Sequence, residues 1–268
     1  MNQVVVSQQT GYARNASESA YPNLWRGLVG WWLPSVNPRG GNRLFDLSPF
    51  RNHGTLTNMT NDDWVVSGGA GALDFDGTDD YVDSKTTMQL TGSFTVSAWI
   101  NFSRIQSSAS IVDALVNVQS TTYANYWANL GTVDSRLEFS LFDGTNNPRS
   151  SVLFSTTNKW LHVTGVRNVS SDTVVLFVDG VQVASVTDTT TSVPPHSQVS
   201  IGGQVAPAGR YANALLDDIR IYNRALTVPE IRLLASKRGI GLQPRPKQYT
   251  FYQTVTGSKR RRILTGMT

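Results

Sequence analysis

Five aspartates crowd into ten residues of the chain and form its best candidate for a metal site. They are Asp74, Asp76, Asp79, Asp80 and Asp83. Carboxylate oxygens gathered in a loop suit a hard cation such as calcium. The spacing differs from that of an EF-hand, because no glutamate closes the loop. The same residues also suit turns with solvated edges. We therefore expect either one calcium that stabilises the fold or no metal, and in neither case a catalytic one.

Carboxylates suited to glycoside hydrolysis are missing from the sequence. That reaction needs two carboxylates about 5–10 Å apart, which one strand can supply at positions i and i+2. Glu138 is the only glutamate between residues 19 and 229, and the residues two positions away from it are Arg136 and Ser140. A glucanase-type pair is therefore not expected.

Nucleophilic and metal catalysis also lack their residues. The chain has no cysteine and three histidines, so a thiol nucleophile is excluded and a multi-histidine zinc site is not expected. No Gly-x-Ser-x-Gly motif is present. His162 lies in an apolar strand pattern and His53 in a turn, positions that favour structural roles. We predict that the protein is not an enzyme, has no catalytic residues and requires no cofactor.

An aromatic group in a polar stretch is the candidate ligand site. Tyr123, Tyr126 and Trp127 lie among Asn and Thr residues at 120–130. Exposed aromatic rings beside planar polar groups can bind sugars. The alternative is that these rings pack in the core or against another subunit. The sequence leaves both interpretations open, with packing favoured.

The charge of the chain is strongly uneven. From residue 231 onward there are nine basic residues and no acidic one, whereas residues 1–230 hold 14 basic and 19 acidic side chains, a net charge of −5. Such a basic tail fits an acidic partner surface or a phosphate backbone. The tail residues we expect to dock on a partner are Arg245, Lys247, Lys259, Arg260, Arg261 and Arg262. Nucleic acid is not expected, because a recognition helix, a zinc finger and an aromatic-basic sheet motif are all missing.

Targeting signals are not visible in the sequence. The N-terminal residues lack the apolar run of a secretory signal peptide, and no apolar stretch approaches 18 residues. We therefore expect a protein made in a cytoplasm, without secretion by a signal peptide and without a membrane partner.

Short alternating segments between residues 27 and 226 predict an all-β sandwich. In residues 94–102 every second residue is apolar, from Phe94 to Phe102. The Asp179-Gly180 pair between two apolar runs predicts a hairpin with a type I′ turn. One helix is expected after Thr227, where Thr227 and Glu230 form a capping box.

Eight segments occur in an order that resembles a known family. They are GLVGWW at 27–32, FDLSPFRNHGTL at 45–56, ALDFDGTDDYV at 72–82, FTVSAWI at 94–100, WLHV at 160–163, LFVDG at 176–180, IGG at 201–203 and LDDIRIYNRALT at 216–227. Together they resemble the laminin-G-like jelly-roll branch of the concanavalin A-like lectin/glucanase superfamily. The resemblance implies a two-sheet antiparallel jelly-roll sandwich over about 27–235, with one short C-terminal helix and extended N- and C-terminal arms.

Further expectations come from the same resemblance. The family often carries one structural calcium, and Asp76 and Asp217 are the positions that it implies. The flanking segments WRGLVG at 25–30 and SKRGI at 236–240 are similar to laminin-G-like proteins of tailed bacteriophages and prophages. Because this fold hosts enzymes, lectins, adhesion modules and virion proteins, the fold does not determine the function.

The sequence thus predicts an N-terminal arm (1–26), a jelly-roll domain (27–235) and a basic C-terminal tail (236–268). The leading hypothesis is a non-enzymatic structural protein of a phage-like particle, a capsid decoration or a tail or fibre component. It would be assembled in the host cytoplasm and docked on other virion subunits through its arm and tail. We also expect a homo-oligomer. The alternative is a carbohydrate-binding adhesion module.

Overall fold

The computed structural model of the chain describes residues 4–8, 14–37, 40–84, 88, 90–107, 113–120, 126–191, 197–204, 210–243, 249–253 and 265–266. The chain divides into two compact units. One unit is the continuous segment Leu24–Ile240, and the other combines Met1–Asn23 with Gly241–Thr268.

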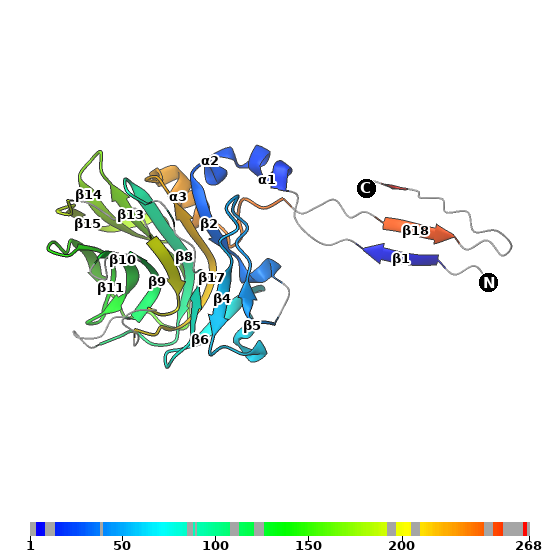
Figure 1. Ribbon diagram of the computed structural model, residues 1–268, viewed down its shortest axis with the longest axis horizontal. Coiled ribbons are helices and arrows are strands. Elements are labelled where there is room, and N and C mark those ends of the chain that lie inside the picture. The colour runs from blue at the N-terminus through cyan, green and yellow to red at the C-terminus, as the bar shows by residue number, and fades with distance from the viewer. Residues whose placement is uncertain are drawn as a thin grey trace. The chain divides into compact units, whose positions relative to one another are not determined.

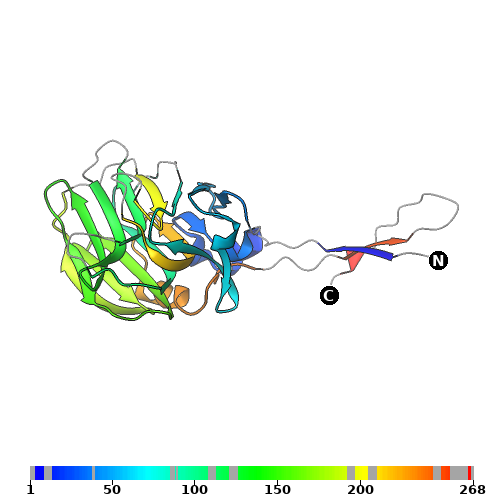
Figure 2. The ribbon, with the colours of Figure 1, turned by 90° about the horizontal axis from the view of Figure 1, so that it is seen from below.

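The larger unit is a sandwich of two antiparallel sheets, each of eight strands (Figure 1). A single apolar cluster fills the space between them, with Phe75, Phe94 and Phe139 among its largest members. The predicted two-sheet jelly-roll sandwich with one short C-terminal helix is confirmed. We name the two layers the β9 sheet and the β8 sheet after their central strands, and Figure 2 shows the same layers from below.

The β9 sheet has the spatial order β12-β11-β10-β9-β16-β7-β4-β3. Its strands are β3 (Arg43–Leu44), β4 (Gly54–Thr57), β7 (Tyr81–Asp83), β9 (Asp113–Ser120), β10 (Tyr126–Val133), β11 (Arg136–Asp143), β12 (Arg149–Leu153) and β16 (Ser197–Ile201). Neighbours in space are thus often distant in sequence.

The β8 sheet has the spatial order β15-β14-β13-β8-β17-β6-β5, and β2 also pairs with β17. Its strands are β2 (Leu28–Trp32), β5 (Trp64–Ser67), β6 (Ala70–Asp76), β8 (Phe94–Phe102), β13 (Trp160–Asn168), β14 (Thr173–Val178), β15 (Val181–Thr187) and β17 (Asn213–Tyr222).

The alternation predicted for residues 94–102 is confirmed in β8. Phe94, Val96, Ala98, Ile100 and Phe102 all lie in the core and are at most 1% exposed. An extended strand directs alternate residues to opposite faces, so the polar residues between them face away from the core. This alternation is what gives each sheet a second, polar face.

Two local predictions are also confirmed. Asp179 and Gly180 have φ values of 49° and 76°, which a type I′ turn between β14 and β15 requires. Helix α3 (Val228–Leu234) begins after Thr227, whose backbone N–H donates to Glu230 Oε2 at 2.8 Å. The capping box therefore determines where α3 starts.

Two short helices near the N-terminus were not predicted. They are α1 (Arg14–Ala20) and α2 (Pro22–Trp25). Arg14 and Glu18 form an i,i+4 pair at 2.7 Å in α1, a weak local signal. The 3-10 turns η1 (Pro34–Val36) and η2 (Asn61–Asp63) complete the helical elements of the described residues. None of these helices has the length and hydrophobicity that crossing a bilayer requires.

The smaller unit contains a three-stranded sheet of the order β1-β18-β19. Strand β1 (Val4–Gln8) pairs antiparallel with β18 (Tyr249–Gln253), from Val4 opposite Gln253 to Gln8 opposite Tyr249 (Figure 1). Strand β19 (Thr265–Gly266) pairs with the other edge of β18. The N-terminal and C-terminal segments therefore pair with each other.

A bulge in β17 places a charged cluster on the outer face of the β8 sheet. The register between β17 and β8 shifts after Asp217, and Asp218 has a φ of 49°. Arg220 binds both oxygens of Asp218, at 2.7 and 2.9 Å, and its guanidinium lies 3.9 Å from the Trp31 ring centroid. Arg220 is 1% exposed, so this is a fully buried ion pair.

We expect Arg220→Ala to lower the free energy of unfolding by about 3–5 kcal/mol, because it leaves the Asp218 carboxylate buried without its cation. Urea denaturation followed by tryptophan fluorescence measures this loss. Arg232→Ala removes an exposed arginine of α3 and should change the free energy by no more than about 0.5 kcal/mol. A loss below about 1 kcal/mol for Arg220→Ala would contradict the assigned role.

Candidate functional site

A row of polar residues crosses the outer face of the β9 sheet from edge to edge. Backbone register pairs one residue of each strand with one of the next, across all eight strands. In sheet order this polar row consists of Arg43, Thr55, Asp83, Ser200, Asn117, Asn129, Ser140 and Arg149. In seven of the strands, residues next to these along the chain lie in the core. Because side chains alternate along a strand, the polar row faces away from the core.

The polar row is exposed at its ends and buried at its centre. Arg43 and Arg149 are exposed, whereas Asn117 and Asn129 are 1% and 2% exposed. Among the described residues, neither Nδ2 nor Oδ1 of Asn129 has a hydrogen-bond partner, and nor does Oδ1 of Asn117. A buried amide without partners costs roughly 1–3 kcal/mol. The two amides are therefore not explained by the stability of the sandwich.

The residues beside the central amides are held in place by hydrogen bonds and ion pairs. Ser140 donates to Glu138 Oε1 at 3.0 Å, and Arg149 lies 2.7 Å from Glu138 Oε2. Gln198 donates to Asp83 at the other side of the amides. Gly131 pairs with Glu138, and a Cβ at Gly131 would lie 2.7 Å from Asn129 Nδ2. The Asp113 carbonyl and the Asn129 amide thus occupy the space that a side chain at residue 131 would need.

The carboxylates of this face do not form a catalytic pair. Glu138 on β11 and Asp83 on β7 are four strand spacings apart, about 19 Å. Glycoside hydrolysis needs two carboxylates within about 5–10 Å of each other. Both oxygens of Glu138 are also engaged by Ser140 and Arg149. Among the described residues, Glu138 and Asp83 are therefore too far apart to act together as a glycosidase pair.

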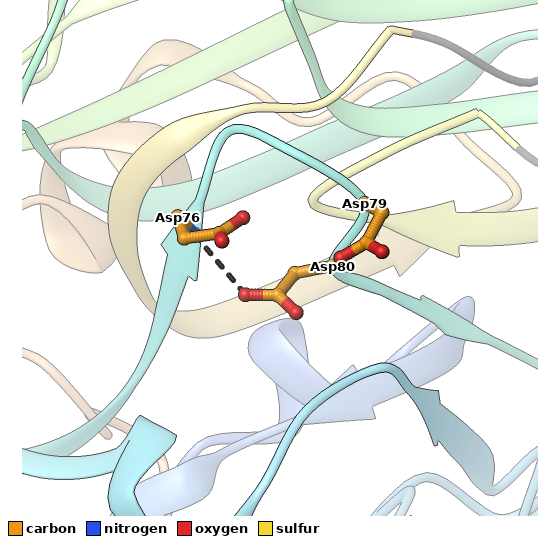
Figure 3. A group of neighbouring side chains, drawn as sticks. All are labelled: Asp76, Asp79 and Asp80. Atoms are coloured by element: carbon orange, nitrogen blue, oxygen red, sulfur yellow. Dashed lines mark hydrogen bonds between the residues drawn. The ribbon is translucent and has the colours of Figure 1, made fainter.

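The aspartate loop after β6 forms the candidate metal site. One carboxylate oxygen each of Asp76, Asp79 and Asp80 lies within 4.8 Å of the others, and the carboxylates meet where the loop turns from β6 to β7 (Figure 3). The Asp76 backbone N–H donates to Asp80 Oδ2 at 3.2 Å. Burial, together with the nearby carboxylates of Asp76, Asp63 and Asp79, raises the pKa of Asp80 to about 6. A divalent cation would relieve this repulsion.

Asp217, the other calcium position implied by the family resemblance, lies elsewhere. Asp76 pairs with Asn213 on β17, and Asp217 is four residues farther along that strand, about 13 Å away. Asp217 accepts from Ser35 and lies 3.7 Å from Arg238. Burial, followed by the adjacent Asp218 carboxylate, raises its pKa to about 7. The structure therefore brings Asp79 and Asp80 to Asp76, but not Asp217.

The predicted aromatic platform is described only in part. Tyr123 lies outside the described residues, and for Tyr126 and Trp127 the backbone of β10 is described. Trp127 pairs with Gln119 of β9 and with Phe142 of β11. Trp127 comes two residues before Asn129 on β10. Its backbone position is therefore in the row of paired residues next to the polar row.

The basic tail residues that we expect to dock on a partner also lie outside the described residues. Arg245, Lys247, Lys259, Arg260, Arg261 and Arg262 all fall in the two segments 244–248 and 254–264. Lys237 and Arg238, the last basic residues before them, belong to the larger unit. Arg238 lies 4.1 Å from the Trp160 ring centroid and donates to the Gly68 carbonyl at 2.8 Å.

Sequence reasoning missed the two central amides. Asn117 stands between Val116 and Val118, and Asn129 between Ala128 and Leu130. Each triplet shows one polar residue between two core residues, which is the available signal. The two asparagines lie opposite each other because of the register between β9 and β10. The triplets alone do not reveal this register.

A family model described as the concanavalin A-like lectin/glucanases superfamily, of laminin-G type, matches residues 76–232. The chain belongs to this superfamily. No sequence among curated proteins matches it.

Solved structures of this superfamily fold match the chain as well. One is the receptor-binding domain of botulinum neurotoxin D, with a TM-score of 0.59 and 16% identity over 78% of this chain and 52% of that one. A second is domain 4 of AbnA, an extracellular GH43 arabinanase of Geobacillus stearothermophilus, in complex with arabinotriose. Its TM-score is 0.59, with 15% identity over 78% of this chain and 98% of that one.

A third match is the Trypanosoma rangeli sialidase in complex with sialic acid, with a TM-score of 0.57 and 18% identity over 78% of this chain and 32% of that one. The chain spans about half the length of the toxin domains that it matches. At these identities the likeness establishes the lectin-like jelly-roll fold. Carbohydrates are bound in these two matched structures, of which one is a sialidase and the other a domain of an arabinanase.

We expect calcium to raise the melting temperature at pH 7.5 and to have a smaller effect at pH 5. Without metal, the raised pKa of Asp80 makes this group favour the folded state less as the pH rises from about 4 to about 6. Bound calcium would offset this loss of stability, but only at a pH at which Asp80 is ionised. Melting curves with calcium or EDTA at both pH values test the site.

Asp80→Asn should abolish the calcium effect, whereas Asp134→Asn, in an exposed turn, should leave it intact. Equal calcium shifts in the unaltered protein and in Asp80→Asn would show that the loop does not bind the ion.

Proposed function

We propose that this chain is a non-catalytic, glycan-binding jelly-roll module. The observation that carries the proposal is the polar row, whose central amides Asn117 and Asn129 are buried with unpartnered atoms on the outer face of the β9 sheet. Sugar sites need a few placed polar groups of this kind. The superfamily and the carbohydrate-bound structures that share its fold support the same interpretation.

The predicted aromatic platform belongs to this proposal. Trp127 pairs with Phe142 and Gln119 in the row next to the central amides. Aromatic rings beside hydrogen-bonding side chains suit the apolar and polar faces of a sugar. Trp127 has the same strand alternation as Asn129, whereas the backbone position of Tyr126 is on the face of Ala128, which lies in the core, and Tyr123 is outside the described residues.

We expect the full chain to bind at least one neutral or acidic oligosaccharide on a glycan array and to release no reducing ends from it. Binding is expected from the polar row, and the lack of cleavage follows from the separation of Glu138 and Asp83. Isothermal titration and a reducing-end assay on the same oligosaccharide measure the two parts. Cleavage at enzymatic rates would contradict the non-catalytic assignment.

A second candidate function is a structural part of a phage-like particle, as a capsid decoration or a tail or fibre component. The pairing of β1 with β18 supports it, because this gathers both ends of the chain in a unit of their own. That unit carries most of the basic residues after position 231. Its partners would be acidic surfaces of other virion subunits, reached by charge-assisted contacts during assembly in the host cytoplasm. The glycan-binding module would then be displayed by the particle as a homo-oligomer.

We expect removal of residues 244–268 to leave the sandwich folded and to prevent incorporation into particles. The cut keeps residues 236–243, because Arg238 binds the Ser67 and Gly68 carbonyls and Gly239 donates to Asp218. Sedimentation of particles followed by immunoblotting measures incorporation, and the melting temperature measures folding. As a control, Lys237→Ala should be incorporated normally. Full incorporation of the truncated chain would contradict docking through the tail.

A further inference from the structure

We propose that copies of this chain associate head to tail, through an aromatic and basic patch at one end of β4 and an acidic patch at its other end. Both patches lie in the larger unit, so the inference depends neither on glycan binding nor on docking through the tail. It adds to the proposed homo-oligomer the two surfaces through which the copies would meet.

The basic patch is formed by the segment that leads from β3 into β4. Its members are Arg43, Phe45, Phe50, Arg51 and His53. The Arg43 guanidinium lies 5.3 Å from the Phe45 ring centroid, and the rings of Phe45 and His53 meet edge to face with centroids 5.1 Å apart. Burial, together with the positive charges of Arg43 and Arg51, lowers the pKa of His53. The two arginines therefore act on the same ring.

Hydrogen bonds to Asp46 hold this loop in one conformation. The Asp46 carboxylate accepts from the backbone N–H groups of Ser48 and Asn52, at 2.8 and 2.7 Å. The Phe50 N–H donates to Ser48 Oγ at 3.2 Å, and Arg51 has a left-handed φ of 56°. The loop thus presents Phe50 and Arg51 in a fixed arrangement, which lowers the entropy that binding costs.

The basic patch is open to solvent. Phe50 is 62% exposed, and among the residues whose side chains are described it is the only aromatic one that is mostly exposed. Arg43 and Arg51 are exposed as well, and neither forms an ion pair within the described part of the chain. Aromatic rings and arginines of this kind are typical centres of protein interfaces. The partner of such a patch should be acidic and partly aromatic.

The acidic patch has these properties. Asp76 and Asp79 are exposed where the chain turns from β6 to β7 (Figure 3). Tyr81 follows this turn, and its half-buried ring stacks on that of Tyr211 with centroids 6.4 Å apart. The acidic patch therefore consists of Asp76, Asp79, Tyr81 and Tyr211, and it complements the basic patch both in charge and in aromatic character.

The two patches of one molecule lie too far apart to bind each other. His53 directly precedes β4, and Asn58 directly follows it and donates to the Asp79 carbonyl at 3.0 Å. The extended segment from His53 to Asn58 spans about 16 Å. A second copy is therefore needed to bring an acidic patch to the basic one. Because this contact joins two different surfaces, each junction leaves one patch of each kind free for further copies.

The aromatic residues give the contact its strength. Exposed ion pairs alone contribute little to stability, and salt screens them. The Phe50 ring would lose its exposure against the Tyr81 and Tyr211 rings, and this burial of apolar surface is what the copies gain on association. The charges steer the approach, because residues 1–230 carry a net charge of −5 and the basic patch is a local exception.

Sedimentation velocity of the full chain at increasing concentrations tests the inference. The buffer contains EDTA, so that no divalent cation screens the aspartates. We expect the sedimentation coefficient to rise past that of a dimer, and to rise less in high salt. Phe50→Ser combined with Arg51→Asn should raise the dissociation constant by about tenfold or more. Asp76→Asn combined with Asp79→Asn should have the same effect.

A mixture of these two double variants gives a second readout. The aspartate variant keeps its basic patch, and the Phe50 variant keeps its acidic patch, so one junction can form between them and no other. We expect each variant alone to remain monomeric at concentrations at which the mixture forms a one-to-one complex that does not grow.

The control variant removes comparable side chains from other places. Val169→Ser combined with Arg232→Ala replaces an exposed valine and an exposed arginine outside both patches. This variant should associate like the unaltered protein. All three double variants should keep the melting temperature of the unaltered protein, because the side chains that they change are exposed.

The outcomes separate the inference from the proposed functions. A chain that stays monomeric at every concentration would overturn the inference and leave glycan binding untouched. If the chain associates and both patch variants associate equally well, the homo-oligomer stands, but the copies meet through another surface and the inference is wrong. If the chain is monomeric and binds a soluble peptide of glutamate and tyrosine through Phe50, the partner is a different protein, which also overturns it.

Discussion

The buried guanidinium of Arg220 is the contact on which closure of the sandwich depends. It joins three segments that are far apart in the sequence: Trp31 on β2, Asp218 in the bulge of β17, and the carbonyl of Ile240 after α3. Asp218 in turn accepts from Trp31 Nε1 at 2.6 Å and from the Gly239 N–H at 2.7 Å. Removing one member of a buried charge pair leaves the other charge buried and uncompensated, so these three segments stabilise one another through Arg220.

This cluster also explains why the segment after α3 stays with the sandwich. Arg238 is held between the Trp160 ring, the Ser67 and Gly68 carbonyls and the Asp217 carboxylate. The SKRGI segment at 236–240 therefore has a packing role in this chain. The sharp change in composition that the sequence shows after residue 231 does not coincide with a loss of contacts, because the first basic residues beyond it still bind the β8 sheet.

Much of the fold was predictable because its signals are local. The alternation of β8, the Asp179-Gly180 turn and the Thr227 capping box each need only a few neighbouring residues. His53 also has the structural role expected of it, since its Nδ1 accepts from the Asp46 N–H at 2.9 Å. Burial lowers the pKa of His162 to about 3, in keeping with a neutral structural histidine.

The parts that were not predictable depend on contacts between distant segments. The bulge at Asp218 is stabilised by hydrogen bonds from Trp31 and Gly239, which are far from it in the sequence. Asp217 belongs to the same bulge. Its partners Ser35 and Arg238 lie near the beginning and the end of the sandwich segment in the sequence. The polar row could not be predicted for the same reason. Each of its residues is an ordinary polar residue of one strand, and only the register of the eight strands brings them into one row.

Both outer faces of the sandwich hold buried polar groups, and the two faces differ in how many of these groups are covered by segments of the same chain. On the β8 sheet, the carboxylates of Asp217 and Asp218 are covered by segments of the same chain, which supply Ser35, Arg238 and Gly239 as partners. On the β9 sheet, Asn129 keeps both a donor and an acceptor unpartnered in the described part of the chain. The row that contains it ends in exposed arginines at both edges. On the β8 sheet, Ser97 Oγ, Trp99 Nε1 and Arg220 Nη1 are buried without a partner among the described residues as well, so unpartnered atoms occur on both faces of the sandwich. Local departures from full hydrogen bonding are expected at functional positions, where stability is given up for binding.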